Sequence, residues 1–229
     1  MKRLVFISDT HNKHKKVTIP ECHILFHTGD WTSRGQKHEV REFAKWLEKQ
    51  PAKHIVIIPG NHEVEFEKNL PENLSWITDY CNRVKVLIHE SCEVEGIKIW
   101  GSPATPAFGR GWAWNYARDI AESAHIFKPF IGEIWDKIPE DTEILLTHGC
   151  PYGILDLATN HSTGHLDHVG CYELRKKVDS LPNLRISAAG HLHLSGGSQE
   201  IIGNTTFINA AICNDLYEVF DHRKVIIDF

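Results

Sequence analysis

Residues 54–63 read HIVIIPGNHE, an apolar run that leads directly into polar side chains. A short, nearly continuous run of Ile and Val predicts a strand that is buried on both faces, as in a parallel sheet. Asn61 and His62 would then lie where this strand ends. An amide and an imidazole at that place need a structural or chemical explanation.

The segments before this run extend the pattern. Residues 3–8 (RLVFIS) and 22–29 (CHILFHTG) are apolar runs of the same kind. Between the second and third runs, residues 38–50 carry apolar side chains at the i, i+3, i+4, i+7 spacing of a helix, namely Val40, Phe43, Ala44 and Leu47. The order strand, helix, strand predicts a βαβ unit.

The rest of the chain predicts more strands and a change of sheet type. Further strands are expected at 83–89, 97–102, 143–149 and 185–191, and helices at 119–137 and 169–180. The tail predicts strands joined by turns at 199–202, 205–210, 216–220 and 224–228. We expect a βαβ core closed by a second, antiparallel β layer. No repeat, low-complexity tract or linker interrupts the chain, so one domain is expected over residues 1–229.

Composition limits the possible partners. The chain has 229 residues, 41% of them apolar and 24% charged, with a formal net charge of -5. This acidic balance argues against an extended nucleic-acid-binding surface. No segment reaches the roughly 18 apolar residues of a membrane span, and the apolar run at the N-terminus is too short for a signal peptide, so a cytoplasmic protein is expected. Six scattered cysteines without CxxC pairs indicate reduced packing thiols.

The ends of the predicted strands share one kind of residue. The segments SDTH, TGDWT, PGNHE, LTHG and AGHLH each offer metal ligands, and ligands of open α/β sheets gather at the carboxyl ends of strands. Taken alone, the polar residues of each segment could be explained by a turn or by a histidine buried in the core. A single site explains all five together.

The number of donors indicates more than one metal. Two Asp, one Asn and four His exceed the four ligands of a single zinc site. They suit two cations about 3.5 to 4 Å apart that share a carboxylate, an arrangement used in phosphoryl transfer. Oxygen and nitrogen donors without thiolate favour two divalent ions of Mn, Fe, Zn or Co.

The five segments also carry a resemblance. In their order, SDTH, GDWTSRG, GNHE, THG and GHLH resemble the signature blocks of the calcineurin-like metallophosphoesterases, from Ser8 to His193. The segments GSPATPAFGRGWAWN, LTHGCPYGILD and FINAAICN are similar to the metallophosphoesterase-domain-containing branch.

This resemblance implies a fold, a site and a mechanism. The fold is a four-layer αββα sandwich with two mixed sheets and a dinuclear centre at the strand ends. One metal would be held by Asp9, His11, Asp30 and His193. The second would be held by Asn61, His148 and His191, with Asp30 bridging. His62 would meet the phosphate or protonate the leaving oxygen, while a hydroxide that bridges the metals attacks phosphorus.

Residues around the strand ends are candidates for substrate contacts. Arg34 could contact the phosphate, although a solvated loop arginine is an alternative. The segment 100–118 combines Gly, Pro and aromatic residues, which suits a stacking surface for a nucleobase or simple packing on the core. His161, His165 and His168 are expected to be loop residues that line or cover the pocket.

The function that these features favour is hydrolysis of phosphodiester bonds in small nucleotide-like substrates. A phosphomonoesterase or a nuclease with the same core is an alternative enzyme. A noncatalytic scaffold is an alternative of another class, against which the complete ligand set argues. Substrate identity, metal identity and oligomeric state stay open.

Overall fold

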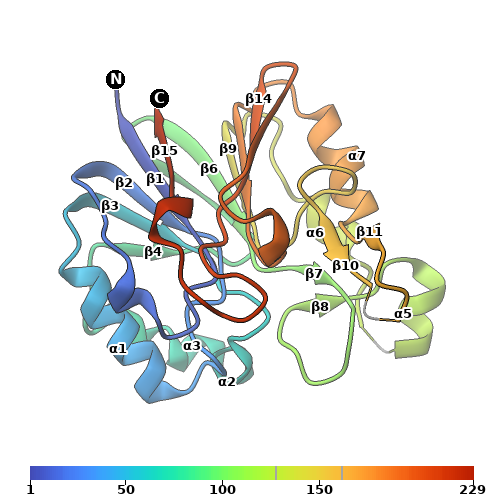
Figure 1. Cartoon of the computed structure of the whole chain (residues 1–229), viewed down its shortest axis with the longest axis horizontal. Helices are drawn as coiled ribbons and strands as arrows, with labels where there is room; N and C mark the ends of the chain where they lie inside the picture. Colours follow the sequence, from blue (N-terminus) through green and yellow to red (C-terminus); the bar gives the residue numbers. More distant parts are fainter. Residues whose placement is uncertain (127, 161) are drawn as a thin grey trace.

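Two β-sheets packed face to face form the centre of the protein (Figure 1). The structure is a computed structural model that describes residues 1–126, 128–160 and 162–229. Helices cover the outer face of each sheet, so the layers follow one another as helix, sheet, sheet and helix.

The first sheet contains the N-terminal strands and the last strand of the chain. Its order is β15 (Val225–Asp228), β1 (Arg3–Ile7), β2 (Cys22–His27), β3 (Ala52–Ile57) and β4 (Val84–Val86). Strands β1 to β4 are parallel, and β15 pairs antiparallel with β1. The predicted βαβ unit is confirmed, with α1 (Lys37–Glu48) between β2 and β3.

The second sheet is mixed. Its order is β13 (Gln199–Ile202), β14 (Thr205–Asn209), β12 (Ile186–Ala189), β9 (Ile144–Thr147), β6 (Ile97–Ser102) and β5 (Glu90–Val94). The four central strands are parallel, and only the edge strands β13 and β5 are antiparallel to their neighbours. The expected antiparallel sheet in the tail is therefore wrong, because β14 extends the parallel strands and β15 joins the other sheet.

Short helices and hairpins complete the fold. Beside the first sheet these are α2 (Val64–Lys68), α3 (Leu70–Asn73), α4 (Ser75–Thr78) and 3₁₀ helices at His14–Lys16 and Asp221–Arg223. Beside the second sheet these are α5 (Ile120–Ile126), α6 (Gly132–Trp135), α7 (Tyr172–Ser180) and a 3₁₀ helix at His193–Ser195. Two small strand pairs join β7 (Thr105–Pro106) to β8 (Asn115–Tyr116) and β10 (Leu157–Thr159) to β11 (Leu166–His168).

Side chains alternate between the two faces of each strand, and the apolar core therefore consists of three clusters. Leu4 and Phe6 of β1 face the space between the sheets, whereas Val5 packs toward α1. Trp100 of β6 and Leu174 of α7 belong to a third cluster outside the second sheet. Three apolar clusters separate four layers, which confirms the αββα sandwich.

Two other expectations needed correction. The helix expected at 119–137 is two short helices, since Pro129 cannot donate a helical hydrogen bond and Phe130 forms a β-bridge with Ala117. The strand expected at 216–220 is a turn, because the Asn214 side-chain oxygen accepts hydrogen bonds from the backbone of Leu216 and Glu218.

All six cysteines are free and five are buried, as expected for packing thiols. Among the described residues, no helix is both long enough and apolar enough to cross a membrane.

Candidate metal centre

The functional side chains follow the carboxyl ends of five parallel strands. Asp9 and His11 follow β1, Asp30 follows β2, and Asn61 follows β3. From the second sheet, His148 follows β9, and His191 and His193 follow β12. Because the two sheets pack face to face, their loops meet at one edge, and all seven predicted metal ligands lie there.

The backbone of these loops is strained. Asp9, His11, Asp30 and His191 all have positive φ angles, of 54°, 41°, 56° and 66°. Residues other than glycine rarely adopt this conformation, and it persists where the surrounding structure enforces it, often at functional sites. A Cβ atom on Gly60 would lie 2.3 Å from Asp30 Oδ1, so only glycine lets the two loops approach this closely.

One group of ligands surrounds Asp9. Its Oδ1 lies 3.3 Å from His193 Nε2 and 3.8 Å from His11 Nε2, and the two imidazole Nε2 atoms are 3.3 Å apart. His193 Nδ1 donates to the Asn214 carbonyl oxygen at 3.0 Å. Since a carbonyl oxygen only accepts, this bond directs the Nε2 lone pair of His193 toward Asp9.

A second group surrounds Asp30. Its Oδ1 lies 3.3 Å from His148 Nε2, which is also 2.9 Å from Asn61 Oδ1. His148 Nδ1 donates to the Thr28 carbonyl oxygen at 2.8 Å, so its Nε2 also presents a lone pair. Asp30, His148 and His191 offer donor atoms within 4.8 Å of one another.

This donor set fits a divalent cation. Around His148 Nε2, a carboxylate oxygen, an amide oxygen and a ring lone pair converge in a buried place, which is unfavourable without a positive charge. Burial alone would lower the pKa of His148, but the adjacent Asp30 carboxylate outweighs it and raises the pKa to about 9. A divalent metal supplies the same positive charge to oxygen and nitrogen donors.

His62 follows Asn61 in the loop after β3, and it forms a third group of possible metal ligands with His11 and Asp30. Its Nδ1 donates to the Ser33 carbonyl oxygen at 2.8 Å, so Nε2 faces the cavity, 3.9 Å from Asp30 Oδ2. Its backbone N–H donates to Asp30 Oδ1 at 2.8 Å. The ring is therefore fixed next to the Asp30 carboxylate, with Nε2 turned toward the cavity.

Glu63 supports the site in a way that the sequence analysis did not predict. Its buried carboxylate accepts hydrogen bonds from the backbone of Asp30, Thr32 and Gly60, and from the Thr32 hydroxyl at 2.8 Å. It thus joins the loop after β2 to the loop after β3. Its place inside GNHE was the only signal in the sequence, since its partners Thr32 and Asp30 in the loop after β2 are 31 and 33 residues away.

A cavity of about 340 Å³ opens over the metal ligands. Three aromatic side chains form its walls, each beside an imidazole. The ring of Phe108 lies 5.0 Å from His191, that of Trp112 lies 4.7 Å from His62, and that of Tyr217 lies 4.7 Å from His11.

Other candidate residues lie outside this cavity. The Arg34 guanidinium is 5.7 Å from the centre of the Trp112 ring, and Arg34 does not line the cavity. His165 and His168 are exposed and do not line it either, although Leu157, Ala158 and Thr159 of β10 do. His161 lies outside the described residues.

Comparison with known proteins agrees with this arrangement. Residues 2–195 match the family model of the calcineurin-like phosphoesterases. Metallophosphoesterase domain-containing protein 1 of Homo sapiens and that of Mus musculus are each 32% identical over 98% of this chain and 70% of their own length.

Solved structures share the fold. The protein TT1561 of Thermus thermophilus superposes with a TM-score of 0.59 at 13% identity, over 99% of this chain and 98% of that one. The phosphopantetheinyl hydrolase of Mycobacterium tuberculosis gives a TM-score of 0.51 at 15% identity, over 93% and 90%. The family match and the identity to the curated relatives decide the assignment. This chain belongs to the calcineurin-like phosphoesterase family and is a metal-dependent phosphoesterase.

Proposed function

We propose that the chain hydrolyses phosphodiester bonds of small nucleotide-like substrates at a centre of two divalent metals. One observation carries the proposal: Asp30 belongs to two groups of side chains that could each hold a metal ion. One group is Asp30, His148 and His191, and the other is His11, Asp30 and His62. His11 also belongs to the third group, with Asp9 and His193. We assign Asp9, His11, Asp30 and His193 to one metal. We assign Asp30, Asn61, His148 and His191 to the other.

The chemistry follows from these positions. Bound there, two cations would neutralise phosphate oxygens and lower the pKa of water toward about 7. Hydrolysis joins a water oxygen to phosphorus and breaks the bond to the leaving oxygen, which then takes up a proton. His62 supports that last step, because its Nδ1 is held by Ser33 and its Nε2 faces the cavity, where it can deliver a proton.

The walls of the cavity support a nucleotide-like substrate. The flat faces and edges of Phe108, Trp112 and Tyr217 offer stacking partners within one cavity of about 340 Å³. Base–aromatic stacking is worth about 1 to 3 kcal/mol per base in nucleic-acid complexes. A small diester with one base fits this volume better than a duplex, which agrees with the net charge of -5.

Two further properties belong to the proposal. We place residues 1–229 in a single domain, because the cluster between the sheets contains residues from the first strand and from the last. We also keep the cytoplasmic location and the contact between Arg34 and substrate as predictions.

A substrate panel tests the proposed function. The purified chain would be loaded in turn with Mn, Fe, Zn and Co and assayed with a phosphodiester, a phosphomonoester and single-stranded DNA. We expect metal-dependent turnover that is highest on the diester. Preference for the monoester or for DNA would replace the proposal by the corresponding alternative, and full metal loading without turnover would favour a scaffold.

A further inference from the structure

Among the described residues, the lining of the cavity above the metal ligands includes no lysine or arginine, the side chains that usually hold phosphate. Its charged or ionisable lining residues, among the described part of the chain, are His11, Asp30, His62, His191, His193, Asp215 and Tyr217. The attraction of an anionic substrate therefore falls to the metal centre and His62 alone.

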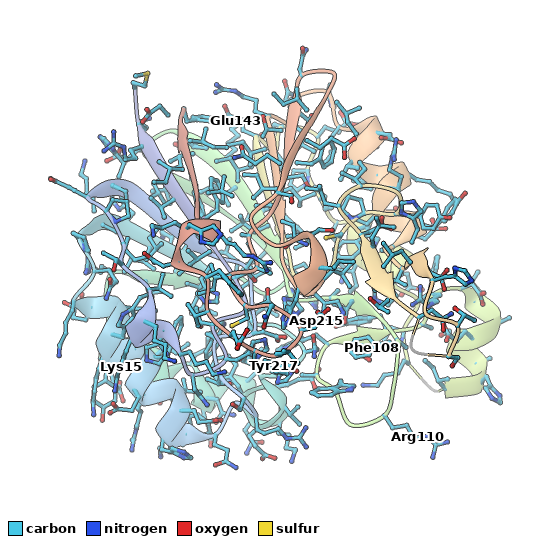
Figure 2. The ribbon with its side chains drawn as sticks, viewed as in Figure 1. Lys15, Phe108, Arg110, Glu143, Asp215 and Tyr217 are labelled. Carbon is cyan, nitrogen blue, oxygen red and sulfur yellow. The ribbon has the colours of Figure 1, made fainter. Side chains whose placement is uncertain are left out.

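Asp215 adds a negative charge at the rim of this cavity. Figure 2 shows Asp215 and Tyr217 on the same loop near the centre of the molecule, and both line the cavity together with Phe108. Asp215 is exposed, and its carboxylate has no ion-pair or hydrogen-bond partner in the described ranges. No ion pair among the described residues therefore cancels its charge directly.

The loop that carries Asp215 is fixed to the metal site. The Asn214 side-chain oxygen accepts from the backbone N–H groups of Leu216 and Glu218 at 3.0 and 2.8 Å, and its Nδ2 donates to Glu218 Oε2 at 2.9 Å. The Asn214 carbonyl oxygen accepts from His193 Nδ1 at 3.0 Å. Tyr217 completes the turn with a positive φ of 58°. Asp215 is thus held beside the residue that orients a metal ligand.

Three cations lie near the loop or the aromatic walls. Arg223 Nη1 donates to the His193 and Cys213 carbonyl oxygens at 3.0 and 2.9 Å. Lys13 Nζ is 5.9 Å from the centre of the Tyr217 ring and donates to the Tyr217 carbonyl oxygen. The Arg34 guanidinium is 5.7 Å from the centre of the Trp112 ring. None of these three cations is among the described residues that line the cavity, whereas the exposed carboxylate of Asp215 is.

We propose that Asp215 selects phosphodiesters over phosphomonoesters by charge. A diester carries one negative charge, whereas a monoester carries nearly two above its second pKa of about 6. The additional charge finds no lysine or arginine in the cavity lining and is repelled by Asp215. This inference rests on the proposed function and names the residue that gives the same site its substrate class.

Two esters with the same leaving group test the proposal. Methyl 4-nitrophenyl phosphate and 4-nitrophenyl phosphate would be compared at pH 8 by kcat/KM, with wild type, Asp215→Asn, Asp215→Glu and Glu200→Gln. Glu200 lies on the exposed edge strand β13, so Glu200→Gln removes the same charge at a remote place. Binding would be measured separately by calorimetry with phenylphosphonate and its monomethyl ester, which differ by one charge.

We expect Asp215→Asn to shift the kcat/KM ratio toward the monoester by about threefold to tenfold, as for one charge pair in a partly solvated site. The affinity for phenylphosphonate should rise by the same factor relative to the affinity for its monomethyl ester. Asp215→Glu should keep the wild-type preference, and Glu200→Gln should not change it. Near 1 M salt, where the Debye length is about 3 Å, the shift should shrink.

An unchanged ratio and unchanged relative binding in Asp215→Asn would overturn the inference and leave the proposed function intact. A wild-type protein that turns over neither ester would overturn the proposed function. The two phosphonates would still decide whether Asp215 discriminates by charge.

Discussion

The Asp30 carboxylate lies close to several candidate ligands at once. Its Oδ1 accepts from the His62 backbone and faces His148, while its Oδ2 faces His11 at 4.0 Å. The sequence predicted that the ligands meet, because each follows a predicted strand. It could not predict Glu63 or Asp215 as part of the site, since only the tertiary fold brings Glu63 to Asp30 and Thr32 and brings Asp215 to the cavity over the metal ligands.

The proposed bridging role of Asp30 leads to a prediction on metal content. Asp30→Ala should weaken both metals, because it is near both groups of ligands, whereas Asn61→Ala should mainly weaken one. Elemental analysis of the two variants at a series of metal concentrations measures this. Loss of one metal alone from both variants would contradict the bridging assignment.

His62 gives a second prediction at this scale. His62→Ala should lower turnover about 100-fold to 10,000-fold on a diester with a poor alkoxide leaving group, as expected for loss of a general acid. Both metals should remain bound, with the wild-type content by elemental analysis. A nitrophenyl ester needs less protonation, so its loss should be smaller. An equal loss on both esters would remove the general-acid role and leave electrostatic binding of the phosphate.

Individual helices and strands could be predicted where a local pattern of apolar residues specifies them. Helix α1 was predicted because Val40, Phe43 and Leu47 repeat at helical spacing, and all three are buried against the first sheet. Three of the four strands expected in the tail are present, but their partners were not predicted. Pairing of β15 with β1 joins residues more than 200 positions apart, and no local pattern specifies such a contact.

Helix α1 carries a prediction on stability. Leu47 is fully buried, so Leu47→Ala should lower the free energy of unfolding by about 2 to 5 kcal/mol. Lys45→Ala on the exposed side of the same helix is the control, with a change within about 0.5 kcal/mol. Denaturant unfolding of both variants gives the comparison. Equal effects would mean that the helix does not depend on its buried face.

The whole molecule should be sensitive to acid through its buried histidines. His14 is 2% exposed and packs on Phe43 and Trp46, and neither ring nitrogen has a hydrogen-bond partner in the described ranges. Burial, with a smaller effect of Lys15, lowers the pKa of His14 to about 4, while Glu42 opposes this.

The sign of the pH effect follows from that pKa. The unfolded chain, in which the pKa of His14 is about 6.5, binds a proton that the folded state does not bind. Stability should therefore fall as pH drops from about 6.5 to about 4, by on the order of 3 kcal/mol from this residue. Unfolding of wild type and His14→Leu at several pH values tests this. The same pH slope for both proteins would exclude His14 as the cause.

The central claim for the whole molecule is that one chain binds two metals around Asp30. The most direct measurement is a crystal structure of the metal-loaded protein with data collected at the absorption edge of the bound metal. We expect two anomalous peaks about 3.5 to 4 Å apart, with Asp30 between them. A single peak at saturating metal, or two peaks of which only one contacts Asp30, would contradict the account.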